Sequence, residues 1–285
     1  MVKGGKYLAT IGIGLLAVLQ TSCFRRFRMT EKDLDLYYQS HSPRPESKTI
    51  EQGKHHLHFV QTGSDSLPLL LMIHGAPGAW YGYISYLSDS LLHRKFAIAS
   101  VDRPGYHKSK IGGKTLSIIQ QADLIAHIFR SDTTRPVYLL GRSYGAPIAA
   151  VLAARFPKQV KGLVLVAPAV NPELEKYWWF SGLIRVPPIR WFLPSPINMA
   201  SDEKHMHAKE LYAIKPYWSQ IQCPTTILQG KADWIVKPEN ALFADSALTS
   251  APHKLYMLDG VEHLVTRERP DLVKHILKEL VEEKL

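Results

Sequence analysis

The sequence contains few residues that could form a disulfide bond or a structural metal site. Only two of its 285 residues are cysteines: Cys23 ends an apolar leader, and Cys223 precedes an apolar run. A chain of this length can bury a sufficient core without disulfides, and it shows no Cys/His spacing typical of zinc. Since no carboxylate or cysteine accompanies His55, His56 and His58, we interpret that group as part of a surface strand. We expect neither a structural disulfide nor a bound metal.

Charge of one sign is not concentrated along the chain either. The formal net charge is +10, but the basic residues are scattered, and their one tight cluster, residues 25–28, lies beside the N-terminal apolar run. Nucleic-acid-binding motifs, internal repeats and low-complexity tracts are all lacking. We interpret the charge as favouring solubility and proximity to an anionic membrane surface, and we expect no nucleic-acid partner.

The N-terminal apolar run, residues 7–19, is too short to cross a bilayer comfortably as a helix. It follows two lysines, which is typical of a secretory signal. Its end resembles the lipobox of bacterial lipoproteins, with small residues directly before Cys23, although Gln20 stands where leucine is usual. The resemblance implies a membrane-anchored protein of the cell envelope that is lipidated at Cys23. An uncleaved signal anchor, or a signal peptide cut near Ser22, stays open as an alternative.

The rest of the chain alternates short apolar runs with amphipathic stretches. Residues 55–59 alternate between polar and apolar, whereas the later runs are nearly continuous in apolar character, as in strands buried on both faces of a parallel sheet. The alternation of apolar runs with amphipathic stretches predicts a doubly wound α/β fold with a mostly parallel sheet. The predicted strands are residues 55–59, 69–73, 96–101, 137–140, 163–166, 225–228 and 255–258, and the predicted helices are residues 30–38, 83–92, 118–129, 146–155 and 271–281.

The predicted domain organisation has three parts. Residues 1–23 are the leader, and residues 24–50 form a short helix with a Thr-x-x-Asp capping box, followed by a proline-containing linker. Residues 51–285 form the α/β domain. Within it, residues 171–222 are too long for a simple loop and rich in tryptophan and proline. We interpret this interval as a short cap inserted between sheet strands.

One serine lies in the pattern that a nucleophile requires. The predicted strand at residues 137–140 leads into Gly-Arg-Ser-Tyr-Gly, residues 141–145, and then into a helix. Gly141 and Gly145 flank Ser143 because neighbouring side chains would clash in a sharp strand-to-helix turn. The turn would raise the serine above the sheet edge, and the helix N-terminus would favour developing negative charge there. We predict Ser143 as a nucleophile.

A serine hydroxyl needs a base that is itself oriented by another group. In the chain order that this kind of turn requires, an acid comes next and a histidine last. Asp233 and His263 each follow an apolar run, which places both at the carboxyl edge of the sheet together with Ser143. We predict His263 as the base and Asp233 as the orienting acid, while Glu173 or Glu175 could supply the acid instead.

Another turn follows the first buried strand and reads His-Gly-Ala-Pro-Gly. A His-Gly turn at this place commonly brings a backbone N–H toward the reacting carbonyl. We predict the N–H groups of Ala76 and Tyr144 as the oxyanion hole. His74 and Gly75 would support the turn, His74 by hydrogen bonding rather than by exchanging protons. Asp102 is expected to be a structural loop residue beside the site.

Together these motifs resemble the α/β-hydrolase superfamily over roughly residues 57–285. The resemblance implies hydrolysis through an acyl-enzyme, without a cofactor. Epoxide hydrolases and haloalkane dehalogenases have a similar fold but use an aspartate nucleophile, whereas this chain has Ser143. Prolyl aminopeptidases typically carry HGGPG and a larger cap. The matching stretches, in chain order, are HGAPG at 74–78, DRPGYHKS at 102–109, GRSYG at 141–145, GKADWIVKP at 230–238 and GVEHL at 260–264.

These motifs lead us to expect a serine hydrolase that cleaves a small carboxylic ester or a related acyl bond. The aromatic-rich cap favours an apolar acyl or alcohol group in the substrate. Prolyl-aminopeptidase-like activity and C–C bond hydrolysis are alternatives, because the pocket that selects the substrate is not visible in the sequence. A catalytically silent, membrane-attached binding domain is an alternative of another class. The intact serine, histidine and aspartate favour the enzyme.

Overall fold

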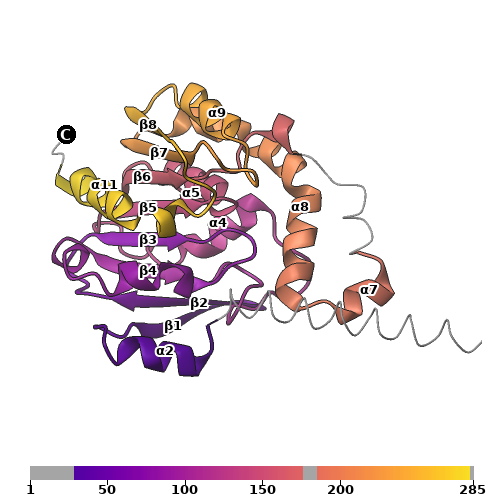
Figure 1. Ribbon diagram of the computed structural model, residues 1–285, viewed down its shortest axis with the longest axis horizontal. Coiled ribbons are helices and arrows are strands. Elements are labelled where there is room, and N and C mark those ends of the chain that lie inside the picture. The colour runs from indigo at the N-terminus through magenta and orange to yellow at the C-terminus, as the bar shows by residue number, and fades with distance from the viewer. Residues whose placement is uncertain (1–28, 176–184, 283–285) are drawn as a thin grey trace, which may run out of the picture. The chain divides into compact units, whose positions relative to one another are not determined.

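The computed structural model describes residues 29–175 and 185–282 (Figure 1), which fall into two compact units, one ending at Arg44 and one beginning at Pro45. The first unit contains α2 (Glu31–Tyr38), whose predicted capping box is confirmed: Asp33 N donates to Thr30 Oγ1 over 3.2 Å, and Thr30 N donates to Asp33 Oδ2 over 2.7 Å. Residues 1–28, with the leader and its cysteine, lie outside the described residues. None of the helices described is long and apolar enough to span a membrane.

The second unit is built on one eight-stranded sheet with the order β1-β2-β4-β3-β5-β6-β7-β8. β1 and β2 pair antiparallel, β2 pairs antiparallel with β4, and every other neighbouring pair is parallel. This mostly parallel sheet confirms the predicted fold class. The strands are β1 (Glu46–Gln52), β2 (His55–Thr62), β3 (Leu69–Ile73), β4 (Ala97–Val101), β5 (Val137–Arg142), β6 (Val160–Val166), β7 (Thr225–Gly230) and β8 (His253–Leu258).

Helices cover both faces of the sheet (Figure 1). On one face, Leu139 and Leu165 of the sheet belong to a core cluster with Ile148 of α5. On the other face, a Cβ atom at Gly162 would lie 2.7 Å from Leu280 Cγ of α11, so strand and helix are in direct contact there. The helices are α3 (Ile84–Leu87), α4 (Ile118–Ala126), α5 (Gly145–Arg155), α7 (Pro187–Phe192), α8 (Ser195–Ile214), α9 (Glu239–Ala247), α10 (Val265–Glu268) and α11 (Pro270–Glu282), with short 3₁₀ turns η1 (Trp80–Tyr83), η2 (Leu92–Arg94), η3 (Pro172–Leu174) and η4 (Lys215–Gln220).

Two elements differ from the sequence expectation. Strand β1 begins at Glu46, inside the stretch predicted as linker; it is a polar edge strand with no buried residue, so it lacks the apolar signal of the others. The helix predicted over residues 83–92 is broken into η1, α3 and η2. Asp89 accounts for one break, because its Oδ1 accepts the N–H groups of Leu91 and Leu92. Such side-chain bonds compete with the helical pattern.

The interval predicted as a cap leaves the sheet after β6 and returns to it at β7. Its main element is α8, a helix of 20 residues that begins directly after Pro194. Proline is tolerated at the first turn of a helix because the N–H groups there have no intrahelical partner. The prolines at 187, 188, 194 and 196 lie before or at the start of α8, and α8 runs beside the carboxyl ends of the strands (Figure 1).

Candidate active site

Ser143 lies on the turn between β5 and α5, with a φ angle of +53°. Non-glycine residues rarely adopt this left-handed conformation, so surrounding bonds must hold it. Ser143 N donates to Val166 O over 2.9 Å, and Ser143 O accepts N–H groups of Ala146 over 3.0 Å and Ala169 over 3.3 Å. The turn is thus tied to β6 on one side and to the first turn of α5 on the other.

Glycines allow the chain segments at this turn to approach one another closely. A Cβ atom at Gly145 would lie 2.7 Å from His74 O at the end of β3, and one at Gly141 would lie 2.6 Å from Gly145 O. A Cβ atom at Gly75 would lie 2.9 Å from the Cβ of Ser143. These separations are too short for real side chains, so the sharp turn and the neighbouring His-Gly turn both depend on glycine.

The structure brings Asp233 and His263 together. Asp233 follows β7 and His263 follows β8, and His263 Nδ1 lies 2.7 Å from Asp233 Oδ2. The aspartate side chain is fully buried, and its Oδ1 accepts the N–H groups of Ile235 and Val236, both over 2.9 Å. Gln229 Nε2 donates to its other oxygen over 3.1 Å. These three bonds hold the carboxylate in place independently of its bond to the imidazole. Nε2 of the imidazole is available to another partner.

The two glutamates named as alternative acids lie in other surroundings. Glu175 pairs with His207 Nδ1 over 3.2 Å and with Lys204, both on α8. Glu173 accepts a hydrogen bond of 2.5 Å from the hydroxyl of Tyr212, also on α8. Both glutamates thus connect the segment after β6 to the cap helix. In the described residues, the carboxylate bonded to His263 is that of Asp233.

The predicted oxyanion donors come from two turns at the same sheet edge. Ala76 is partly buried in the turn after β3, and Tyr144 is the N-cap residue of α5. In the part of the chain that the structure describes, neither backbone N–H donates to a protein acceptor. Buried or half-buried N–H groups are normally paired, so two unused donors at one edge are available to a ligand oxygen.

His74 is a buried part of the turn that carries Ala76. Its Nδ1 lies 2.6 Å from Gly75 O, and its Nε2 accepts the backbone N–H of Arg103 over 3.0 Å. Burial, reinforced by the nearby Arg103 charge, lowers the pKa of His74 to about 3. A neutral imidazole that donates through Nδ1 and accepts through Nε2 satisfies both contacts.

Known proteins share this sequence pattern and this fold. The family model of the alpha/beta hydrolase fold matches residues 68–199. Epoxide hydrolase 1 of Caenorhabditis elegans is 23% identical over 83% of this chain and 70% of its own. Monoglyceride lipase of Mus musculus is 23% identical over 74% of this chain and 80% of its own. The crystal structure of a membrane phospholipase A, a bacterial virulence factor, has a TM-score of 0.67 and 19% identity over 97% of this chain and 100% of that one.

The chain has the α/β-hydrolase fold, and its residues 68–199 match the model of that family. It is accordingly a hydrolase. The carboxyl edge of its sheet carries the serine turn, the His–Asp pair and the two free N–H groups described above. Besides these residues, the hydrolase holds two buried polar networks at the same edge that the sequence did not reveal.

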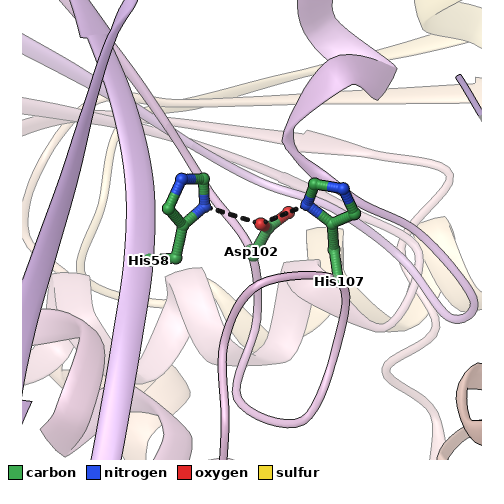
Figure 2. A group of neighbouring side chains, drawn as sticks. All are labelled: His58, Asp102 and His107. Atoms are coloured by element: carbon green, nitrogen blue, oxygen red, sulfur yellow. Dashed lines mark hydrogen bonds and ion pairs between the residues drawn. The ribbon is translucent and has the colours of Figure 1, made fainter. Parts of the chain in front are cut away.

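The first network of the hydrolase centres on Asp102 (Figure 2). His58 Nδ1 and His107 Nδ1 lie 2.7 and 2.8 Å from the same oxygen, Asp102 Oδ2, while Oδ1 accepts the N–H of Trp80 over 2.8 Å. The expectation of a surface strand is wrong for His58, which is 3% exposed. The loop after β4 covers this residue, with Ser109 Oγ accepting the His58 N–H over 2.8 Å.

Through these contacts Asp102 connects three segments of the hydrolase: β2, η1 and the loop after β4. Burial alone would raise the pKa of its carboxyl group, but hydrogen bonds from His107 and His58 outweigh burial and hold the pKa below its usual value. Among the described residues, these three form the group whose ligand atoms are close enough to hold a metal ion, within 4.8 Å of one another. Each of those atoms already takes part in a His–Asp hydrogen bond, so the network is satisfied without an ion.

The second network pairs Arg103 with Glu203 of the cap helix α8, and both side chains are fully buried. Two nitrogens of the guanidinium bond the two carboxylate oxygens over 2.6 and 3.0 Å. Gln121 Nε2 and the Tyr106 hydroxyl also donate to the carboxylate, over 2.9 and 2.6 Å. Burial would lower the pKa of Arg103, but the Glu203 charge outweighs it and raises the pKa. The carboxylate of the pair thus accepts four hydrogen bonds.

This ion pair reaches the groups predicted as oxyanion donors. Arg103 also donates to Gly75 O over 3.2 Å, and its guanidinium carbon lies 4.6 Å from the ring centroid of Tyr144. The cap helix is thus linked through one side chain to both turns that flank Ser143. Sequence reasoning assigned the Asp-Arg-Pro-Gly stretch to a structural loop but had no signal for its partner, because Glu203 is one of several charged residues along α8.

Proposed function

We propose that this hydrolase cleaves carboxylic esters through an acyl-enzyme, with Ser143 as nucleophile, His263 as general base and Asp233 as the residue that orients the base. The observation that carries the proposal is the His263–Asp233 bond of 2.7 Å at the sheet edge where the Ser143 turn also ends. A buried aspartate that accepts Nδ1–H keeps the imidazole in the tautomer whose Nε2 can take a proton.

The proposed reaction has two steps. His263 Nε2 takes the hydroxyl proton as Ser143 Oγ attacks the ester carbonyl, and the same proton then passes to the leaving alkoxide to release an alcohol. The N–H groups of Ala76 and Tyr144 stabilise the oxyanion, each worth about 3 kcal/mol of barrier where such donors have been removed. Water, activated by His263, then cleaves the acyl–serine ester and releases the acid.

The serine at residue 143 favours an ester over an epoxide as the substrate. The worm relative is named an epoxide hydrolase and the mouse relative a monoglyceride lipase. Epoxide hydrolases use an aspartate nucleophile, whereas this chain carries Ser143 in its strained turn. The cap also carries exposed apolar side chains, among them Trp191 and Phe192. We therefore propose an ester with an apolar acyl or alcohol group, and a monoacylglycerol is the first natural substrate to test.

The test is hydrolysis of p-nitrophenyl esters of increasing acyl length by the full chain, together with labelling by a fluorophosphonate probe. Turnover and labelling should both disappear in Ser143→Ala and persist in the matched control Ser219→Ala, which changes an exposed serine. Labelling without ester turnover would overturn the ester substrate and favour an amide, a peptide or a C–C bond. If a folded chain shows neither signal, the silent binding domain becomes the better interpretation.

We also propose that the N-terminus attaches the hydrolase to the membrane of the cell envelope through lipidated Cys23. The support is the sequence alone, a basic start, the apolar run at residues 7–19 and small residues before the cysteine. Mass spectrometry of the mature protein tests the proposal. A diacylglyceryl mass on an N-terminal Cys23 is expected, and an intact Met1 with an unmodified Cys23 would contradict it.

A further inference from the structure

The cap presents a short helix with several large, exposed apolar side chains. α7 (Pro187–Phe192) reads Pro-Pro-Ile-Arg-Trp-Phe and has no buried residue. Trp191 is 78% exposed and Phe192 is 88% exposed, and Val186 and Ile189 beside them are exposed as well. Single exposed apolar residues are ordinary, but a contiguous group of large ones marks a surface that something else covers.

Polar bonds to α8 fix the position of α7. Arg190 forms a bidentate pair with Asp202 of α8, with N–O distances of 2.9 and 2.8 Å. Asn198 Nδ2 donates to the carbonyl oxygens of Arg190 and Leu193 over 3.0 and 3.2 Å, which anchors the end of the helix. Since bonds from α8 fix the backbone of α7, its aromatic side chains can stay exposed while the helix keeps its position.

The charge around α7 indicates what kind of surface this helix would contact. Arg185 and Arg190 share the single carboxylate of Asp202, at 3.7 and 2.8 Å, so this end of the cap keeps an excess of positive charge. Across residues 185–222 there are five lysines and arginines against three aspartates and glutamates. Tryptophan and phenylalanine beside arginine is the composition that segments lying in the headgroup region of an anionic bilayer use.

We propose that α7 is a membrane-contact surface, which inserts Trp191 and Phe192 into the headgroup region of an anionic phospholipid bilayer. The contact is separate from the N-terminal leader and from catalysis. α8, which carries α7, also supplies Glu203 to the buried pair with Arg103. Docking at α7 would therefore hold the cap side of the hydrolase, and with it the carboxyl edge of the sheet, next to the lipid.

The test is quenching of tryptophan fluorescence by vesicles of phosphatidylcholine and phosphatidylglycerol (7:3) with brominated acyl chains, using the full chain. The wild type should lose more fluorescence than Trp191→Phe, because the replaced indole would no longer be in reach of the bromine atoms. Leu91→Trp is the control: Leu91 is 49% exposed and precedes β4, at the opposite edge of the sheet. The fluorescence added there should not be quenched.

Several outcomes would overturn the proposal. These are equal quenching of wild type and Trp191→Phe, quenching of the fluorescence added by Leu91→Trp, or no binding of the chain to the vesicles. An equal Trp191 contribution on phosphatidylcholine alone would overturn the anionic assignment. A wild-type dimer in sedimentation that Trp191→Ser/Phe192→Ser converts to a monomer would assign the surface to a second copy instead. Quenching needs no turnover, so failure of ester hydrolysis leaves this test unaffected.

Discussion

Two histidine–carboxylate pairs in this hydrolase are built alike but lie in different surroundings. His263 Nδ1 lies 2.7 Å from Asp233, on loops after β8 and β7, and its side chain is 11% exposed. His207 Nδ1, on α8, lies 3.2 Å from Glu175, and its side chain is 2% exposed. The ring of His207 stacks on that of Tyr144 with centroids 4.6 Å apart. Both pairs satisfy the distance that an oriented base requires, but their access to a substrate differs.

The two pairs differ in burial, not in the presence of a bonded carboxylate. His207 Nε2 is buried without a hydrogen-bond partner in the described part of the chain. Burial would raise the pKa of Glu175, but the hydrogen bond and charge of His207, followed by those of Lys204, lower it to about 2. The buried pair therefore serves to hold α8, and the accessible pair is the one proposed for catalysis.

Breaking the accessible pair should have the largest effect. Asp233→Asn removes the acceptor that holds the Nδ1–H tautomer, so we expect kcat to fall by about 10⁴-fold with the fold retained. Hydrolysis of a p-nitrophenyl ester measures the change. Asp259→Asn is the matched control, because its side chain is 87% exposed and pairs with Lys231. A fall of less than tenfold in Asp233→Asn would remove Asp233 from the mechanism.

Glu203 is a buried carboxylate that pairs with an arginine rather than with a histidine. Glu203→Ala would leave the Arg103 guanidinium buried and unpaired, which should lower the free energy of unfolding by about 3–5 kcal/mol. Urea unfolding followed by circular dichroism measures this loss. The surface pair of Glu51 with His56 supplies the control, since Glu51→Ala should change stability by less than about 0.5 kcal/mol. Similar losses in the two variants would show that burial of the Arg103–Glu203 pair does not matter.

His74 is a buried histidine that bonds to backbone groups rather than to a carboxylate. Its pKa is lowered to about 3, so between pH 6.5 and pH 3 the unfolded chain binds a proton that the folded chain does not. Stability should therefore be fully present above pH 6.5 and fall below it, by about 2 kcal/mol between pH 7 and pH 5. Urea unfolding at several pH values should show this slope in the wild type. The slope should be flatter in His74→Gln, and an unchanged slope would contradict the assignment.

The smallest effect on activity is expected from the enclosed pair. Glu175→Gln keeps an acceptor for His207 but removes the charge, so stability should fall by about 1 kcal/mol, whereas kcat should stay within about threefold of the wild type. Ester kinetics and urea unfolding of one preparation measure both values. If Glu175→Gln reduced kcat as much as Asp233→Asn, the distinction between the two pairs would fail.

Much of the hydrolase fold follows from local features of the sequence. Near-continuous apolar runs identified the parallel strands because such strands are buried on both faces, and β3 has the predicted bounds Leu69–Ile73. The glycines around residue 143 identified the sharp turn, because only glycine tolerates its close contacts. The order of the runs also placed Asp233 and His263 at one edge of the sheet, since the carboxyl ends of parallel strands share that edge.

Tertiary structure alone decided which polar residues are buried together. Glu203 lies 100 positions beyond Arg103 in the chain, and Asp102 lies 44 positions beyond His58, so no local pattern relates the partners. The polar strand β1 also acquires its place only by pairing with β2. Local sequence determines where an element starts, how it turns and which face is apolar, whereas the choice of partner for a buried charge depends on the packing of distant elements.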